Sequence, residues 1–163
     1  MRYGSLKNYL AERGPGDQED EHDHPYMKSE FFREPLSSTA VEALVDLFVR
    51  GRRSGEARKL DFMPWGGAYN RVPPTATAFP HRKELFLLEH SVVVPAGFDA
   101  AATESARVWL SDSWELVHPS GSGGVYANFP DTDLPDEDRA YWGDNLERVR
   151  RVKERHDPDR VFG

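Results

Sequence analysis

The chain has 163 residues, of which 38% are apolar and 12% aromatic, enough for one domain with its own core. The formal net charge is -7, so duplex nucleic acid is not an expected partner. The absence of cysteine excludes disulfides, thiolate metal ligands and cysteine nucleophiles. No apolar run is long enough to span a membrane and no signal-peptide pattern opens the chain, so we expect a soluble, cytoplasmic protein.

Residues 1–24 are predicted to be a mobile acidic segment outside the domain. A short helix is predicted over Tyr3–Arg13, and the glycine-proline-glycine sequence after it ends the helix. The acidic run Asp17–His24 follows, and runs of like charge usually stay solvated. No scaffold fixes the two histidines in this run, so no metal site is predicted.

Two helices are predicted in the first large unit, residues 25–124. Thr39 and Glu42 have the spacing of a capping box, and apolar residues recur at helical spacing after them, which predicts a helix over Thr39–Arg50. Asp99 is the predicted N-cap of a second helix that runs to about His118.

The stretch Pro64–Val94 carries most of the predicted strand structure. It ends in Leu85–Val94, the most apolar and β-prone run of the chain, which predicts a strand buried on both faces. Glycine and proline interrupt the residues before it, so two or three strands joined by irregular corners are predicted from Leu60 to Val94. Polar side chains at such corners are candidates for ligand contact: Tyr69, Asn70, Arg71, His81 and Arg82.

The last unit, residues 125–163, is predicted to close the domain. A short strand is predicted over Val125–Asn128 and a basic helix over Leu146–His156. The predicted fold class is α+β, a mainly antiparallel sheet with helices packed on one face.

Three motifs occur in a fixed order along the chain. They are Thr75–Arg82 after a glycine pair, Tyr126–Asp131, and Tyr141–Asn145. Together with Lys28-Ser29, these motifs resemble the C-terminal third of berberine-bridge-enzyme-like FAD-linked oxidases over about residues 25–162.

The resemblance implies a cofactor and a place for the site. In that family an N-terminal half binds FAD, the sheet faces the substrate and the closing segment packs against the flavin. We expect the FAD-binding half to be absent from this chain, which has neither a flavin-tethering cysteine nor a glycine-rich phosphate cradle. The implied cofactor-binding residues are Tyr126, Asn128, Tyr141 and Asn145, and the implied substrate-binding residues are Trp65, Asn70, Phe79 and Phe129.

The chain differs from the family at the positions of the residues that act as catalytic bases. Phe129 occupies the position at which many members have a tyrosine that acts as the catalytic base. Arg71 occupies about the position at which plant members have a glutamate base. Losing a general base costs roughly 10²–10⁴ in rate. The remaining candidates for catalysis are Tyr69, Arg71, which stabilises negative charge, and His81, which can act as acid or base. The alternative for His81 is a structural bond to a backbone carbonyl.

Three functions agree with these patterns. The favoured one is a truncated oxidase relative that acts on a small molecule in bacterial natural-product biosynthesis, with FAD or a partner chain supplied in trans. The others are a flavin-free, redox-neutral enzyme of the cyclase type and a non-catalytic small-molecule-binding module. Without an FAD domain, Tyr141, Trp142 and Val152 are expected to be exposed, which predicts a homo-oligomer or a separate partner chain.

Overall fold

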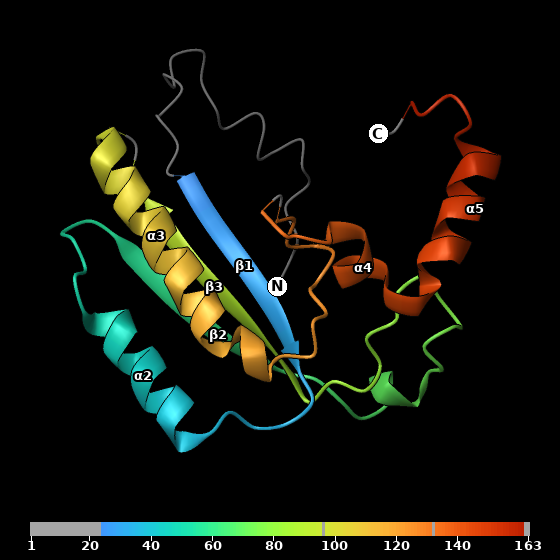
Figure 1. Cartoon of the computed structure of the whole chain (residues 1–163), viewed down its shortest axis with the longest axis horizontal. Helices are drawn as coiled ribbons and strands as arrows, with labels where there is room; N and C mark the ends of the chain where they lie inside the picture. Colours follow the sequence, from blue (N-terminus) through green and yellow to red (C-terminus); the bar gives the residue numbers. More distant parts are fainter. Residues whose placement is uncertain (1–23, 96, 132, 162–163) are drawn as a thin grey trace, which may run out of the picture.

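The computed structural model describes residues 24–95, 97–131 and 133–161. The helix predicted over Tyr3–Arg13 and the acidic run up to Asp23 lie outside these residues. The described chain is a three-stranded antiparallel sheet with helices on one face, which confirms the predicted α+β class (Figure 1). No helix in this part of the chain is long and apolar enough to cross a membrane.

The sheet has the longest apolar strand at its centre. Its strands are β1 (His24–Phe32), β2 (Ala57–Pro64) and β3 (Phe86–Val94), in the order β1-β3-β2 with both pairs antiparallel. Most of β3 is buried, as its composition predicts. Register places Glu30 beside Leu88, so these two residues share one face, and Phe31 points to the other.

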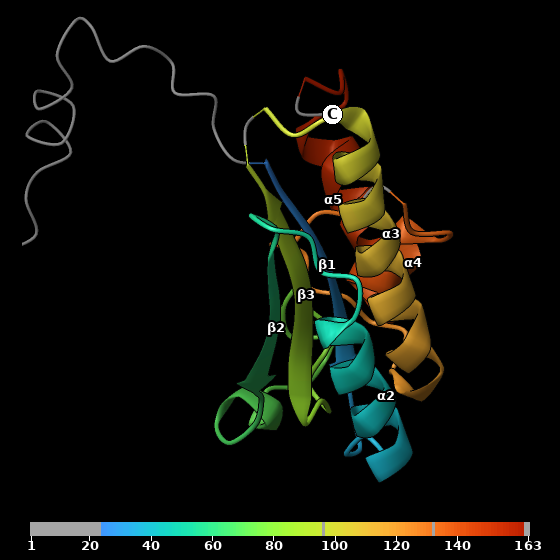
Figure 2. The same cartoon turned by 90° about the vertical axis from the view of Figure 1, so that its left-hand side faces the viewer.

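Two α-helices cover one face of this sheet (Figure 2). They are α2 (Ser38–Val49) and α3 (Ala100–Val117), close to the predicted ranges. Asp99 is the N-cap of α3 as predicted, since it accepts a 2.6 Å hydrogen bond from Ala102 N. The predicted capping box at Thr39 is wrong: Ser37 caps α2 instead, because its hydroxyl lies one residue before the helix.

The core lies between the sheet and these helices in two clusters of buried side chains. Apolar residues of β3 and β1 alternate toward α3, whose buried stripe includes both tryptophans. The first cluster is Val92, Val94, Ala106, Trp109 and Leu110; the second is Phe32, Leu44, Leu88 and Val117.

A buried arginine fastens α2 to the start of β2. The Arg58 guanidinium pairs with the buried carboxylate of Glu56 and lies 4.7 Å from the centre of the Trp109 ring. Its Nη1 donates to three backbone carbonyls at the end of α2, those of Leu47, Phe48 and Arg50. The carbonyls left free where a helix ends therefore have a charged donor.

Two stretches predicted as strands are not strands. Residues 65–85 form an irregular loop with the 3-10 turn η1 (Tyr69–Arg71), because the prolines at 73, 74 and 80 have no N–H to give to a ladder. Residues 125–128 turn back at once, with Phe129 N bonded to Tyr126 O at 2.9 Å. The backbone-to-backbone hydrogen bonds from this part of the chain to β1 come from the glycine run before it, at Ser122 and Gly124.

The C-terminal part begins with the turn η2 (His118–Ser120) and continues through α4 (Glu137–Trp142), η3 (Gly143–Asn145) and α5 (Leu146–His156). The bounds of α5 match the prediction, and none of its residues is buried. In Figure 1, α5 stands away from the sheet. The predicted exposure of Tyr141 is wrong, because other parts of the chain cover this residue and leave only 7% of it exposed. Trp142 is half-buried, and Val152 is 53% exposed.

His90 gives the fold a testable pH dependence. It is fully buried, with Nδ1 2.7 Å from Ser113 Oγ and no described partner for Nε2, and burial lowers its pKa to about 3. At a pH below 6.5, the ordinary pKa of histidine, His90 is protonated in the unfolded chain but stays neutral in the folded chain. The free energy of unfolding should therefore fall by up to about 1.4 kcal/mol per pH unit on acidification from this group alone.

Urea unfolding of the wild type and His90→Gln between about pH 7 and about pH 4.5 measures this dependence. The variant should lose the contribution of one proton to the slope. His156→Gln, at the exposed end of α5, should keep the wild-type slope. Identical slopes in all three proteins would contradict the assignment.

Candidate functional site

Aromatic side chains gather on the sheet face opposite α2 and α3. Phe31 on β1 is fully buried at the centre of this group. Its ring centre lies 5.2 Å from that of Trp65 and 4.9 Å from that of His81, on which it stacks. Phe79 and Tyr126 complete the group with ring centres 6.0 and 6.2 Å from Phe31.

The turn after β2 brings Trp65 and Tyr69 together. Trp65 N donates to Leu85 O at 2.8 Å, which continues the pairing of β2 with the residues before β3. Gly67 then has a φ of +65°, a conformation that glycine adopts without strain. Asn70 Nδ2 donates to Glu84 O at 2.9 Å and fixes η1 against the loop before β3.

An open pocket of about 440 Å³ lies among these rings. Two donors in its walls, Trp65 Nε1 and Tyr69 Oη, are buried without a hydrogen-bond partner of good geometry among the described residues. The Arg82 guanidinium lies 4.3 Å from the centre of the Tyr69 ring. The residues that line the pocket, hereafter the aromatic pocket, are Pro64, Trp65, Gly66, Tyr69, Phe79 and Tyr126.

Burial sets the protonation of the two titratable rings here. It raises the pKa of Tyr69, so the phenol keeps its proton at neutral pH. It lowers the pKa of His81, whose Nε2 donates to Tyr141 O at 3.1 Å, so the ring is neutral at pH 7. This carbonyl bond is the structural alternative that the sequence left open for His81.

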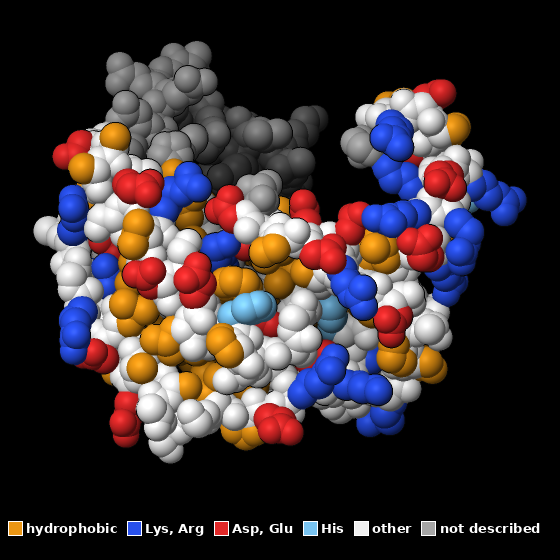
Figure 3. Space-filling view, in the orientation of Figure 1, with side chains coloured by type: hydrophobic (Ala, Val, Ile, Leu, Met, Phe, Trp, Pro, Cys, Tyr) orange, Lys and Arg blue, Asp and Glu red, His pale blue; other side chains and the backbone are white. Residues whose placement is uncertain are grey.

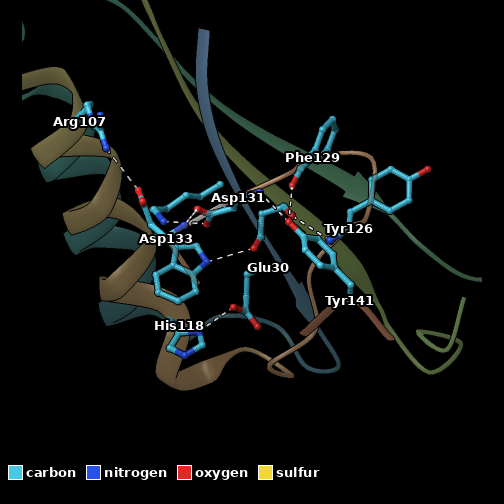
Figure 4. Close-up of polar contacts among 11 residues, drawn as sticks. Glu30, Arg107, His118, Tyr126, Phe129, Asp131, Asp133 and Tyr141 are labelled. Carbon is cyan, nitrogen blue, oxygen red and sulfur yellow. Dashed lines mark hydrogen bonds and ion pairs between the residues drawn. The ribbon is translucent and has the colours of Figure 1, made fainter. Parts of the chain in front are cut away.

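Polar contacts hold the closing segment on β1 (Figure 4). Lys28 and Asp131 form a buried ion pair at 2.8 Å. On the next residue but one of β1, Glu30 accepts from Gly123 N at 2.9 Å and lies 2.7 Å from His118 Nδ1. The Tyr141 hydroxyl accepts from Asp131 N at 2.7 Å, which ties α4 to the same segment.

The glycines before Val125 allow this close approach. A methyl group added at Gly121 would overlap the Glu30 carboxylate, and one added at Gly124 would overlap the His81 ring. The glycine run therefore does more than end α3: it lets a backbone lie directly on β1.

The four residues implied as cofactor-binding lie in different surroundings. Tyr126 lines the aromatic pocket, and exposed Asn128 donates to its hydroxyl at 2.9 Å. Tyr141 and Asn145 are buried against their own chain: Asn145 Nδ2 donates to the carbonyls of residues 74, 77 and 78 at 2.8 to 3.2 Å. Contact of these four with a flavin stays a prediction.

The remaining candidates separate into two groups. Trp65 and Phe79 line the aromatic pocket, and the Phe129 ring lies 5.3 Å from that of Tyr126. Arg71 is exposed, lines none of the described cavities and makes no side-chain hydrogen bond or ion pair with a described residue. Among the described residues no group of three or more histidine, aspartate or glutamate side chains is placed to hold a metal ion.

Sequence reasoning missed Phe31, Glu30 and Glu84. Strand alternation in β1 was the available signal, since it sends adjacent residues to opposite faces. The alternation alone does not indicate a function for these residues, because the sequence does not show which segments cover each face of the strand.

Known proteins share this sequence and fold. The family model "Berberine and berberine like" matches residues 125–163. Berberine bridge enzyme-like 6 of Arabidopsis thaliana is 34% identical over 152 residues, which cover 83% of this chain and 26% of that protein. An uncharacterized FAD-linked oxidoreductase of Bacillus subtilis is 31% identical over 109 residues, or 67% of this chain and 24% of its own length. This chain is a relative of the berberine-bridge-enzyme-like FAD-linked oxidases.

Solved structures of berberine-bridge-enzyme-like proteins share the fold. The wild-type BBE-like 1 of Physcomitrella patens has a TM-score of 0.71 at 28% identity, over 86% of this chain and 29% of that one. BBE-like 28 of Arabidopsis thaliana has a TM-score of 0.76 at 24% identity, over 84% and 32%. The chain thus spans about a quarter to a third of these berberine-bridge-enzyme-like proteins.

Asn145→Ala tests the structural role of this amide. The substitution removes three hydrogen bonds that the buried Asn145 amide donates to the 74–78 loop, which should lower the free energy of unfolding by about 1–3 kcal/mol in urea titrations. Asn128→Ala, at an exposed site, should change it by no more than about 0.5 kcal/mol. Equal losses in the two variants would contradict this structural role of the Asn145 amide.

Proposed function

We propose that this chain is the substrate-binding side of an FAD-linked oxidoreductase. In this proposal the flavin-binding part is supplied by another polypeptide segment, or a flavin binds from solution. The observation that carries it is the aromatic pocket, in whose wall the buried Trp65 Nε1 and Tyr69 Oη contact only each other, so the Tyr69 hydroxyl proton has no acceptor among the described residues. Unpaired buried donors cost free energy unless a ligand satisfies them.

The pocket suits the ring system of a flavin or of an aromatic substrate. Its walls are aromatic rings that can stack on a planar ligand, and the Tyr69 hydroxyl proton can be donated to a ring oxygen or nitrogen of such a ligand. The glycine run offers no free backbone amides to bind the adenosine diphosphate part of FAD. The amides of Ser122, Gly123 and Gly124 already donate to acceptors within the chain.

The described residues bind and orient rather than transfer protons. FAD, when bound, supplies the hydride acceptor of an oxidation. Tyr69 keeps its proton and donates a hydrogen bond, while the rings of Trp65 and Phe79 exclude water. Phe129 has no group that takes up a proton, so the base of a complete oxidation is not at this position.

The redox-neutral alternative rests on the predicted catalytic residues Tyr69, Arg71 and His81, of which Arg71 and His81 would supply the charge and the proton transfer. Arg71 does not line the aromatic pocket, and the Nε2 proton of His81 is held by Tyr141 O. Because no described contact brings the two side chains to one ligand position, the oxidase reading has the better support.

A partner chain or a second copy is part of the proposal. The helix α5 has no buried residue, although it carries an apolar Val152 that is 53% exposed among basic side chains. Helices of this kind gain stability when another surface covers them. A cytoplasmic location and a small-molecule substrate from bacterial natural-product biosynthesis are further expectations from the family resemblance.

Flavin fluorescence tests the proposal directly. Adding the protein to riboflavin, FMN and FAD should quench emission saturably, because aromatic rings quench a stacked flavin. If only the ring is held, the three dissociation constants should agree within about threefold. Tyr69→Phe should weaken binding by about tenfold, the effect of losing one hydrogen bond to a ligand.

The same substitution separates binding from folding. Because the only hydrogen-bonding contact of the Tyr69 hydroxyl in the free protein is with Trp65 Nε1, Tyr69→Phe should change the free energy of unfolding by no more than about 1 kcal/mol. Tyr26→Phe, on the opposite sheet face, is the matched control and should bind flavin like the wild type. Absence of saturable quenching by any of the three flavins would refute flavin binding by this chain.

A further inference from the structure

A second cleft, of about 670 Å³, lies at the outer edge of β1 and is separate from the aromatic pocket. Its walls come from the end of β1, the loop before β3, the glycine run and α4 with η3. Residues 79–82 form the partition, since His81 and Arg82 line the cleft while Phe79 lines the aromatic pocket. Figure 3 shows a hollow near the middle of this face, with histidine side chains beside it.

The interior of this cleft is acidic. Glu30 and Glu84 are 0% and 1% exposed, and they are the buried charged residues among those that line it. Buried His81 has a lowered pKa and adds no charge at pH 7. Of the basic residues that line it, Arg33, Lys83 and Arg139 are exposed. The fourth, Arg82, is half-buried, and its guanidinium lies over the Tyr69 and Phe79 rings of the aromatic pocket.

Only one of the two carboxylate oxygens of Glu84 accepts a hydrogen bond from a described residue. Its Oε1 accepts from Arg33 Nη2 at 3.2 Å and from Nε at 3.4 Å, which is long for a charged pair, and the Arg33 side chain is 57% exposed. Its Oε2 is buried and has no hydrogen-bond partner among the described residues. A buried carboxylate oxygen without a donor costs more free energy than an ordinary unmet hydrogen bond.

The buried Glu30 carboxylate adds a second negative charge that a bound cation would stabilise. Burial raises its pKa, and the nearby Glu84 carboxylate raises it further, against the stabilising contacts with His118 and Gly123. His118 stacks on Trp114 at 4.1 Å, so the carboxylates lie beside an aromatic surface that also lines the cleft. Leu134 and Val125 add apolar surface to the walls.

We propose that this cleft is a second small-molecule site, which takes a primary amine carrying an apolar or aromatic group. The ammonium group donates to Glu84 Oε2 and balances the charge of the two buried glutamates, while the apolar part lies against Trp114 and Leu134. A bound ammonium adds the charge-assisted bond that Glu84 lacks. A neutral alcohol of the same shape offers one weaker donor and no charge.

Titration of the complete 163-residue chain with 2-phenylethylamine, followed by ¹⁵N–¹H NMR, tests the site. The amides of Gly123 and Gly124 report on the cleft, because they lie over Glu30 and His81. We expect saturable shifts of these amides with the amine, and binding of 2-phenylethanol at least tenfold weaker. Equal affinity for the two compounds, or no saturable shift with the amine, would overturn the proposal.

Two substitutions of opposite sign make the test specific. Glu84→Gln should weaken amine binding at least tenfold, whereas Arg33→Gln should strengthen it severalfold, because it removes the cation that competes for Glu84. Arg33 is largely exposed, so its variant should fold even if Glu84→Gln does not. Glu115→Gln, exposed on α3 and outside the cleft, should bind like the wild type.

The proposal fails if Arg33→Gln does not change amine binding or if a folded Glu84→Gln binds like the wild type. It also fails if amine binding is absent and Glu84→Gln instead dissociates an oligomer seen by sedimentation, which would make the cleft a protein interface. Loss of flavin quenching in Tyr69→Phe has no bearing on these results, so the two sites are tested independently.

Discussion

The outer edge of β1 is the constraint on which both cavities depend. An open strand edge invites pairing with other chains, and here the glycine run covers part of it. Phe31 N donates to Gly124 O at 2.8 Å and Ser122 N donates to Phe31 O at 2.7 Å. These two bonds bring the closing segment onto the sheet, where it forms a wall of the cleft on one side and places Tyr126 in the aromatic pocket on the other.

Alternation along β1 then divides the chemistry between the two faces. Glu30 points to the cleft and the helices, while Phe31 points to the aromatic pocket. A register slip of one residue would exchange them and would bury a phenylalanine where a carboxylate accepts from Gly123. The buried pair Lys28–Asp131 opposes such a slip, because moving either charge leaves the other unpaired in the interior.

The sequence predicted elements whose signal is local. The apolar run of β3, the Asp99 cap and the basic helix α5 each lie within a dozen residues, and all three are confirmed. Strands joined by irregular corners were predicted before β3, but proline and long-range contacts such as that of Asn145 make residues 65–85 one irregular loop. The unpaired oxygen of Glu84 depends on segments far apart in the chain, so no local pattern indicates it.

The contacts of the closing segment have a consequence for the order of folding. Lys28 and Asp131 are 103 residues apart in sequence, and Glu30 and His118 are 88 residues apart. Closing loops of this length costs entropy before any contact compensates, and native contacts of long sequence separation form slowly. The residues of the sheet, α2 and α3 all precede residue 118, so we expect the closing segment to dock on a surface that is already formed. Until it docks, Glu30 and Phe31 face water, and the edge of β1 is open to any other extended chain.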